Sequence, residues 1–120
     1  MNHNNMILFQ HWIDNLNQRA DLGLIYAIHC TQNNRFYIGM TVVRGCKPRK
    51  QRQIRCFVAH LSDLQNQQHC CEALQHDWNQ YGEAAFSFNL LEVMECRGTQ
   101  AIRQREAWWH EMAPNLYSRY

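Results

Sequence analysis

The sequence predicts a small domain of the α/β class in its α+β form, with a three-stranded, mostly antiparallel sheet flanked by helices. Its 120 residues, 46% of them hydrophobic, are enough to form one compact core. Runs rich in β-branched and aromatic residues predict strands, and segments whose apolar residues recur every three or four positions predict helices. The expected strands are 24–30, 35–40 and 86–93, and the expected helices are 6–19, 52–67, 71–81 and 100–112.

The first two strands are expected to form a β-hairpin whose turn contains Asn33 and Asn34. Asparagine tolerates the left-handed backbone conformation that tight turns require. If these two residues are the whole loop, Tyr37 faces Cys30 across the hairpin. Side chains repeat their direction every second residue along a strand, so Tyr26 lies on the same face as Cys30. The sequence therefore predicts that two phenol groups converge on one side of the sheet.

The helix expected at 52–67 has an apolar stripe beside a histidine. The residues of this helix that should face the core are Ile54, Phe57, Val58, Leu61 and Leu64. His60 lies next to that stripe, with Cys56 one turn and Arg52 two turns before it. In the helix expected at 71–81, the buried stripe is Leu74, Trp78 and Tyr81. The segment 6–19 is amphipathic, and it either packs against the core or forms the contact of a homodimer.

Positive charge is concentrated in one segment, although the formal net charge is only +2. Between residues 44 and 55 there is no acidic residue, and the basic ones are Arg44, Lys47, Arg49, Lys50, Arg52 and Arg55. Such a run is either a solvated surface loop or a loop that binds phosphate groups.

The sequence contains no recognisable export signal and no apolar run long enough to span a membrane. Two of its six cysteines, Cys70 and Cys71, are adjacent. Reduced thiols, a cytoplasmic location and no membrane partner are therefore expected.

Several segments resemble, in order along the chain, the motifs of the GIY-YIG nuclease family. Leu24-Ile25-Tyr26 and Tyr37-Ile38-Gly39 resemble the two strings that give the family its name. His60, followed nine residues later by His69, is similar to the family's first helix and the loop after it. The other similar blocks are 74–82, 86–92, 105–109 and 114–117. We therefore expect a GIY-YIG-like nuclease domain at 23–120, preceded by a helical extension at 1–22.

The resemblance implies a metal-dependent endonuclease that hydrolyses phosphodiester bonds in DNA, either double-stranded or branched, with RNA left open. Tyr26 or Tyr37, with His60, would help to remove a proton from the attacking water. The residues expected to contact nucleic acid are Arg44, Lys47, Arg49, Lys50 and His69.

The resemblance also assigns the metal site to Glu106. This glutamate would hold one Mg²⁺ or Mn²⁺ on the scissile phosphate. It stands between Ile102 and Trp109 on its helix and so points toward the packed side, where a carboxylate needs a partner. The structural alternative is an ion pair with Arg103 or Arg105.

Two positions depart from the family's pattern. Cys56 stands four residues before His60, where the family places an arginine that neutralises charge on the phosphate. Arg52, one turn away on the same face, or the neighbouring Arg55 would have to replace it. Ser118 stands where the family commonly has an asparagine. These departures leave a second hypothesis open, a catalytically inactive pseudonuclease that binds nucleic acid or another protein.

Overall fold

The computed structural model describes residues 21–43, 55–96 and 98–117, and it contains the expected α+β arrangement. Three strands, β1 (Asp21–Cys30), β2 (Arg35–Val43) and β3 (Phe86–Cys96), form an antiparallel sheet in the order β2-β1-β3. The helices are α2 (Arg55–Gln65), α3 (Glu72–Tyr81) and α4 (Gln100–Met112), with a short 3₁₀ turn, η2 (Glu83–Ala85), before β3. The fold class predicted from the sequence is therefore confirmed. No helix of the described residues is long and apolar enough to cross a membrane.

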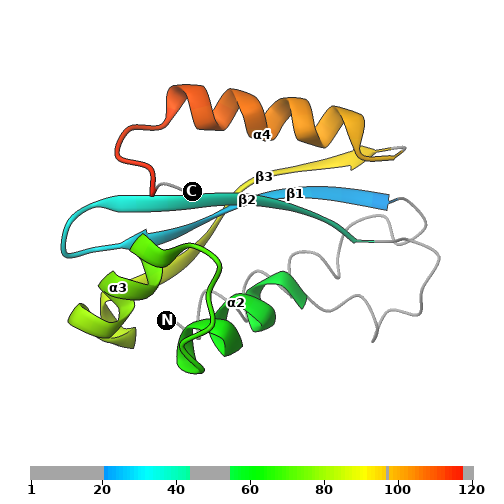
Figure 1. Ribbon diagram of the computed structural model, residues 1–120. Helices are drawn as coiled ribbons and strands as arrows, with labels where there is room; N and C mark the ends of the chain where they lie inside the picture. The colour runs from blue at the N-terminus through cyan, green and yellow to red at the C-terminus, as the bar shows by residue number, and fades with distance from the viewer. Residues whose placement is uncertain (1–20, 44–54, 97, 118–120) are drawn as a thin grey trace.

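The sheet has a hydrophobic core on each face. Figure 1 shows α4 on one side of the sheet and α2 and α3 on the other. Even-numbered residues of β1, such as Leu24 and Ile28, pack in the core that contains Leu74 of α3, while Ile25 packs with Ile102 of α4. Because β1 is the central strand and is covered on both faces, its sequence is an almost continuous apolar run.

The hairpin loop contains four residues, so the predicted hairpin register was wrong by two residues. The backbone N–H of Asn34 donates to the carbonyl of Cys30 at 2.9 Å, and Asn34 has the left-handed φ of 58°. Tyr37 consequently faces Ile28 and not Cys30. Since side chains alternate with a period of two, a shift of two residues keeps Tyr26 and Tyr37 on the same face.

A bulge in β3 changes which residues of that strand face each core. Tyr26 pairs with Leu90, but the preceding Ile25 pairs with Glu92, so Leu91 is an extra residue. Leu90 therefore packs on the α2–α3 side, whereas Leu91 packs on the α4 side. Beyond the bulge, the carboxylate of Glu92 reaches Arg105 of α4.

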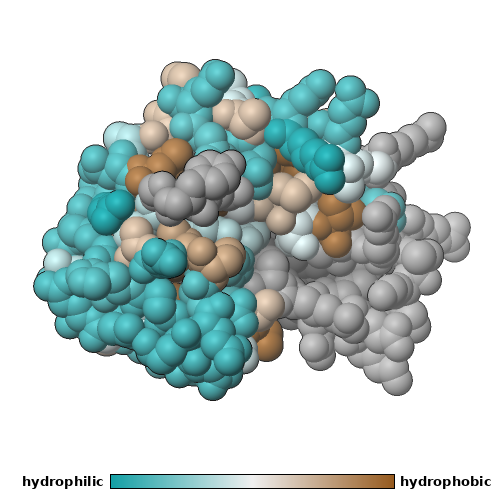
Figure 2. Space-filling view, in the orientation of Figure 1, coloured by the Kyte–Doolittle hydropathy of each residue, from teal (hydrophilic) through white to brown (hydrophobic). Residues whose placement is uncertain are grey.

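Two side chains predicted to be buried are exposed. Val58 of α2 is 56% exposed and Tyr81 of α3 is 38% exposed. Val58 is six residues from the fully buried Leu64, which places it about 120° around a helix of 3.6 residues per turn. Tyr81 is the last residue of its helix. Figure 2 shows hydrophilic residues gathered over α2 and α3, with apolar patches toward α4.

Helix bounds differ from the expected ones only near the ends. Within the described residues α2 begins at Arg55, and it ends at Gln65 because Gln67 takes a left-handed φ of 61°. α3 begins at Glu72 with Cys71 as its N-cap. The helix expected at 6–19, and with it the extension at 1–22 and the homodimer contact, lies outside the described residues.

A buried carboxylate joins three segments at the hairpin end of the sheet. Asp77 of α3 accepts hydrogen bonds from the Tyr117 hydroxyl and from the Asn33 side-chain amide, both at 2.6 Å. The segment containing Tyr117 lies parallel to β2, because Phe36 donates to the carbonyl of Asn115 and accepts from the N–H of Tyr117. Asp77 therefore ties the hairpin loop and the end of the described chain to α3.

The Tyr117→Phe variant tests this network. It removes a hydrogen bond to a buried carboxylate without changing ring packing, so we expect the free energy of unfolding to fall by about 2 kcal/mol. Urea unfolding followed by circular dichroism measures this loss. Tyr81→Phe, at an exposed tyrosine, is the control and should change stability little. Equal stability of the Tyr117→Phe variant and the unaltered protein would contradict the network.

Asp77 should also make stability depend on pH. Burial opposes its ionisation, but hydrogen bonds from Tyr117 and Asn33 outweigh burial and hold the pKa of Asp77 below its ordinary 3.8. A lowered pKa in the folded state adds stability that is complete above the unfolded-state pKa and is lost as the pH falls through the folded-state pKa. The stability difference between the unaltered protein and Asp77→Asn should therefore shrink between pH 7 and pH ~3, measured by urea unfolding. An Asp77→Asn difference that stays constant with pH would contradict this, and Asp63→Asn is the control.

Candidate active site

Tyr26 and His60 form the centre of the candidate site. Tyr26 lies near the middle of the central strand β1. Its ring stacks on Phe88 of β3, with the ring centroids 5.1 Å apart and an angle of 16° between the ring planes. Its hydroxyl lies 2.6 Å from Nε2 of His60, which projects from α2. Tyr26 is only 4% exposed, so its phenol is held firmly against the sheet. A tyrosine and a histidine that are joined by a hydrogen bond can together accept or donate a proton.

Gly39 of β2 makes room for the Tyr26 hydroxyl. The two residues face each other across the β1–β2 pair. A Cβ atom at Gly39 would lie 2.5 Å from the Tyr26 hydroxyl oxygen, a distance shorter than any van der Waals contact. The hydroxyl therefore lies over the backbone of the edge strand, and only glycine leaves that position open.

Tyr37 and His69 complete a cluster of four rings. The Tyr37 ring meets His60 edge-on, with centroids 5.2 Å apart, and meets His69 in the same way at 5.4 Å. Tyr37 is 9% exposed. The structure thus places the two tyrosines predicted to converge around the same histidine.

The two histidines are hydrogen-bonded to each other. Nδ1 of His60 lies 2.8 Å from Nε2 of His69, and Nδ1 of His69 accepts the backbone N–H of Cys71 at 3.0 Å. His69 is only 7% exposed, so it lies within the ring cluster. Burial lowers the pKa of His69, and the nearby carboxylate of Asp63 opposes this effect only in part. His69 is therefore neutral at neutral pH.

Glu106 lies on α4, on the opposite face of the sheet from the ring cluster. One turn before it, Ile102 packs against Gly23 of β1, and one turn after it, Nε2 of His110 donates to the carbonyl of Ile38 at 3.1 Å. Glu106 lies on the helix between these two contacts and is partly exposed.

Arg105 pairs with Glu92 of β3 through two hydrogen bonds of 2.8 Å. This bidentate pair lowers the pKa of the Glu92 carboxyl. The Arg105 guanidinium also lies over the ring of Trp108. Arg105 thus has a structural role that joins α4 to the sheet beyond the bulge.

The other residues assigned from the sequence lie outside the described part of the chain. They are Arg44, Lys47, Arg49, Lys50, Arg52 and Ser118. Arg55 and Cys56 belong to the backbone of α2, but their side chains are not described. Replacement of the missing arginine by Arg52 or Arg55 stays a prediction.

Three contributors to the site were missed in the sequence. Phe88, which stacks on Tyr26, follows Phe86 at the two-residue spacing of a strand face, and this spacing was a usable signal. Gly39 belongs to the Tyr37-Ile38-Gly39 motif, and a glycine inside a strand often marks the close approach of another group. The hydrogen bond from the Cys71 backbone N–H to His69 cannot be predicted from a pattern of side chains.

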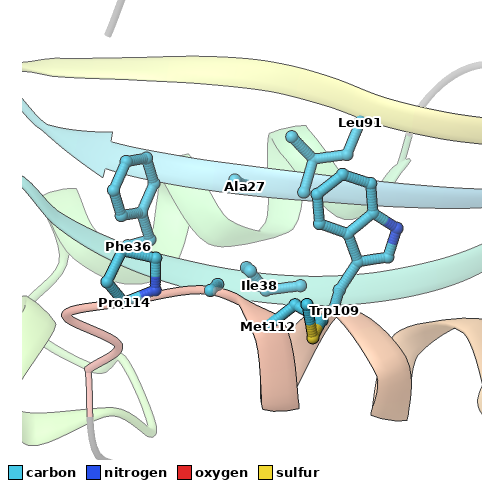
Figure 3. A pocket seen from close by; sticks show the side chains of 8 residues that line it. Ala27, Phe36, Ile38, Leu91, Trp109, Met112 and Pro114 are labelled. Atoms are coloured by element: carbon cyan, nitrogen blue, oxygen red, sulfur yellow. The ribbon is translucent and has the colours of Figure 1, made fainter.

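An apolar pocket of about 240 Å³ lies on the face of the sheet away from the ring cluster. Figure 3 shows Phe36 and Pro114 on one side of it and Leu91 and Trp109 on the other. Its lining side chains provide no acid, base or anionic metal ligand. The chemistry of the site therefore belongs to the tyrosine–histidine cluster.

The Gly39→Ala variant tests how closely Tyr26 approaches the edge strand. The added methyl should displace the Tyr26 hydroxyl from His60 and lower the free energy of unfolding by about 1–3 kcal/mol. A crystal structure of the variant and urea unfolding measure these effects. Gly23→Ala is a matched control, because its Cβ would meet Ile102 at 2.9 Å on the other face. It should lower stability but keep the Tyr26–His60 hydrogen bond; loss of that bond in both variants, or in neither, would contradict our interpretation.

Comparisons with known proteins identify the family to which this fold belongs. Residues 7–112 match the family described as "Putative endonuclease segE, GIY-YIG domain". Among solved structures, the catalytic domain of the homing endonuclease I-TevI is similar, with a TM-score of 0.59 and 28% identity over 79% of this chain and 95% of that one. A mutant of the same catalytic domain, in which one glutamate is replaced by alanine, is similar at 27% identity and a TM-score of 0.59, over 81% and 92% of the two chains. Comparison with curated protein sequences found no significant match.

The matched family covers most of the chain, and the similar structures share its three-stranded sheet and the helices around it. The protein therefore belongs to the GIY-YIG endonuclease family.

Proposed function

We propose that the protein is a metal-dependent endonuclease that hydrolyses phosphodiester bonds in DNA. The observation that carries the proposal is the 2.6 Å contact between the Tyr26 hydroxyl and His60, located at the edge strand of a GIY-YIG fold. Glu106 supports it, because it supplies a carboxylate on α4 at the position where the family resemblance expects the metal ligand. The proposal explains why a buried phenol and two histidines are held together.

Tyr26, as its phenolate, is the base in this reaction. The oxygen of a water molecule attacks the phosphorus atom while its proton passes to the Tyr26 oxygen. The bond from phosphorus to the leaving deoxyribose oxygen breaks, and solvent returns a proton to that oxygen. A free phenol has a pKa near 10, so the phenolate needs stabilisation. A hydrogen bond from His60 supplies it.

Glu106 fits a divalent metal that is shared with the substrate. Within the described residues, no group of three or more histidine, cysteine or acidic side chains could enclose a metal ion. Mg²⁺ does not need such a group, because it keeps several waters and is commonly held by one or two carboxylates plus substrate phosphates. When bound, one Mg²⁺ or Mn²⁺ would stabilise negative charge that develops on the phosphate.

The DNA-binding part of the proposal depends on the basic segment 44–55. Its arginines and lysines would neutralise phosphates on either side of the scissile bond, and binding should therefore weaken with salt. One domain contains one such site, so cleavage of both strands would need two copies or two binding events.

Two features of the sequence favour a second function. Cys56 and Ser118 replace the family's usual arginine and asparagine. Without a cation at the first position, charge on the phosphate is less stabilised and the phenolate is disfavoured. A pseudonuclease that binds nucleic acid without cutting it is the function that these two residues favour.

Nicking of supercoiled plasmid with Mg²⁺ or Mn²⁺ tests the proposal. Cleavage should require the metal and stop with EDTA. Glu106→Gln should lower the nicking rate by at least ~100-fold, since a lost metal contact costs several kcal/mol in the transition state, while DNA binding is retained. Glu111→Gln, at an exposed position of the same helix, is the matched control and should cut normally.

The two functions give different results in this assay. Metal-dependent nicking that disappears in Glu106→Gln supports the nuclease. Nicking that persists in Glu106→Gln contradicts the metal role. A folded protein that binds DNA but cuts no substrate with either metal would identify the pseudonuclease.

A further inference from the structure

We infer that His69 is a positioning residue: through it, the backbone N–H of Cys71 fixes His60 as the hydrogen-bond donor to Tyr26. The inference rests on the proposed function and deepens it, because it states which partner in the central pair holds the proton. A series of three hydrogen bonds supports it, and the series begins at the Cys71 backbone N–H, which can only donate.

The first step concerns His69. A backbone N–H donates and cannot accept, so Nδ1 of His69 must present a lone pair to Cys71. Neutral imidazole has one proton, which is therefore on Nε2 of His69. The donor in each hydrogen bond of the series is thus determined by a backbone group and not by a side chain that could rotate or exchange roles.

The second step transfers this direction to His60. Nε2–H of His69 donates to Nδ1 of His60 at 2.8 Å, so the proton of neutral His60 is on Nε2. That N–H then donates to the Tyr26 oxygen at 2.6 Å. The reverse arrangement, with Tyr26 donating to His60, would place the His60 proton on Nδ1. Two N–H groups would then point at each other between the histidines.

The loop around His69 holds these atoms in place. It begins at Gln67, which has a left-handed φ of 61°, and it ends at Cys71, the N-cap of α3. The backbone N–H of His69 donates to the side chain of Gln75, which itself donates to the carbonyl of Leu64. The bond from Cys71 to the His69 side chain spans only two residues, a local pattern that a short loop can form reliably.

Charged and titratable groups near His69 come from several elements. Asp63 of α2 favours a protonated His69, whereas burial disfavours it and has the larger effect. Tyr37 of β2 contributes only a ring edge, and His60 contributes a lone pair. Protonation of His69 at acidic pH would add a hydrogen at Nδ1 and break the hydrogen bond from Cys71. The tautomer of His60 would then no longer be determined by the backbone.

The consequence for the reaction is that His60 supports the base but is not itself the base. A histidine that donates to the phenol oxygen stabilises the phenolate, and it has no lone pair on Nε2 with which to accept the phenol proton. The water proton is therefore taken by Tyr26 alone. Without His69, His60 could adopt either tautomer, and only one of them supports the phenolate.

Nitrogen NMR of the histidine rings tests this inference directly, without metal or DNA. In the unaltered protein, the spectrum of His60 should show the Nε2–H tautomer alone, with its signals identified by their loss in His60→Gln. His69→Gln should keep that tautomer, because the glutamine amide places an N–H where Nε2–H of histidine stood. His69→Leu fills similar space but has no donor, and it should give a mixture of tautomers at His60. A mixture, or the Nδ1–H form, in the unaltered protein would overturn the inference.

Plasmid nicking supplies the second readout. We expect His69→Leu to cut about 10- to 100-fold more slowly, the effect of losing one hydrogen bond to a charged group, and His69→Gln to cut within a few-fold of the unaltered protein. A role in packing alone predicts the reverse order, because leucine suits an apolar space better than glutamine. If His69→Leu does not fold, the spectrum of the unaltered protein and the His69→Gln variant still decide the inference.

The two proposals can fail separately. A protein with His60 fixed as the Nε2–H tautomer that nevertheless cuts no DNA would contradict the endonuclease and retain the hydrogen-bond chain. A protein that nicks DNA while His60 exchanges between tautomers would retain the endonuclease and overturn the role of His69.

Discussion

The close approach of the Tyr26 hydroxyl to the backbone at Gly39 is the constraint on which the rest of the candidate site depends. It brings a phenol from the central strand over the backbone of the edge strand β2. Phe88 stacks on one side of the ring, and Nε2 of His60 is hydrogen-bonded to the Tyr26 oxygen. His60 can meet it only because α2 packs on that face through Leu64. A single absent side chain thus determines how a strand and a helix, far apart in the sequence, form one site.

The sheet separates the ring cluster from the carboxylate that is proposed to bind the metal. The ring cluster lies with α2 and α3, whereas Glu106 lies on α4, across the other core. The two tyrosines are therefore packed in one core, while the carboxylate belongs to the helix that covers the other core. Desolvation keeps His69 uncharged, while Glu106 remains partly exposed.

The sequence predicted the features that are determined locally. Strand and helix positions followed from periodicity, and the convergence of Tyr26 and Tyr37 held even with the wrong register, because the error was an even number of residues. The loop length was missed because Thr31 and Asn33 are held by Ala85 and Asp77, partners 54 and 44 residues away along the chain. The bulge in β3 and the direction of the histidine hydrogen bonds also depend on backbone groups, which leave no mark in the pattern of side chains.

The segment after α4 affects whether the β2 edge can pair with a second molecule, because it hydrogen-bonds to that edge. β2 is an edge strand, and such a strand offers its outward backbone groups as a template for a strand of another molecule. Here Asn115 and Tyr117 occupy the outward amide and carbonyl of Phe36, and His110 occupies the carbonyl of Ile38. The hairpin half of this edge is therefore closed to intermolecular pairing. Residues 115–117 and His110 thus protect this part of the β2 edge from pairing with a strand of another molecule.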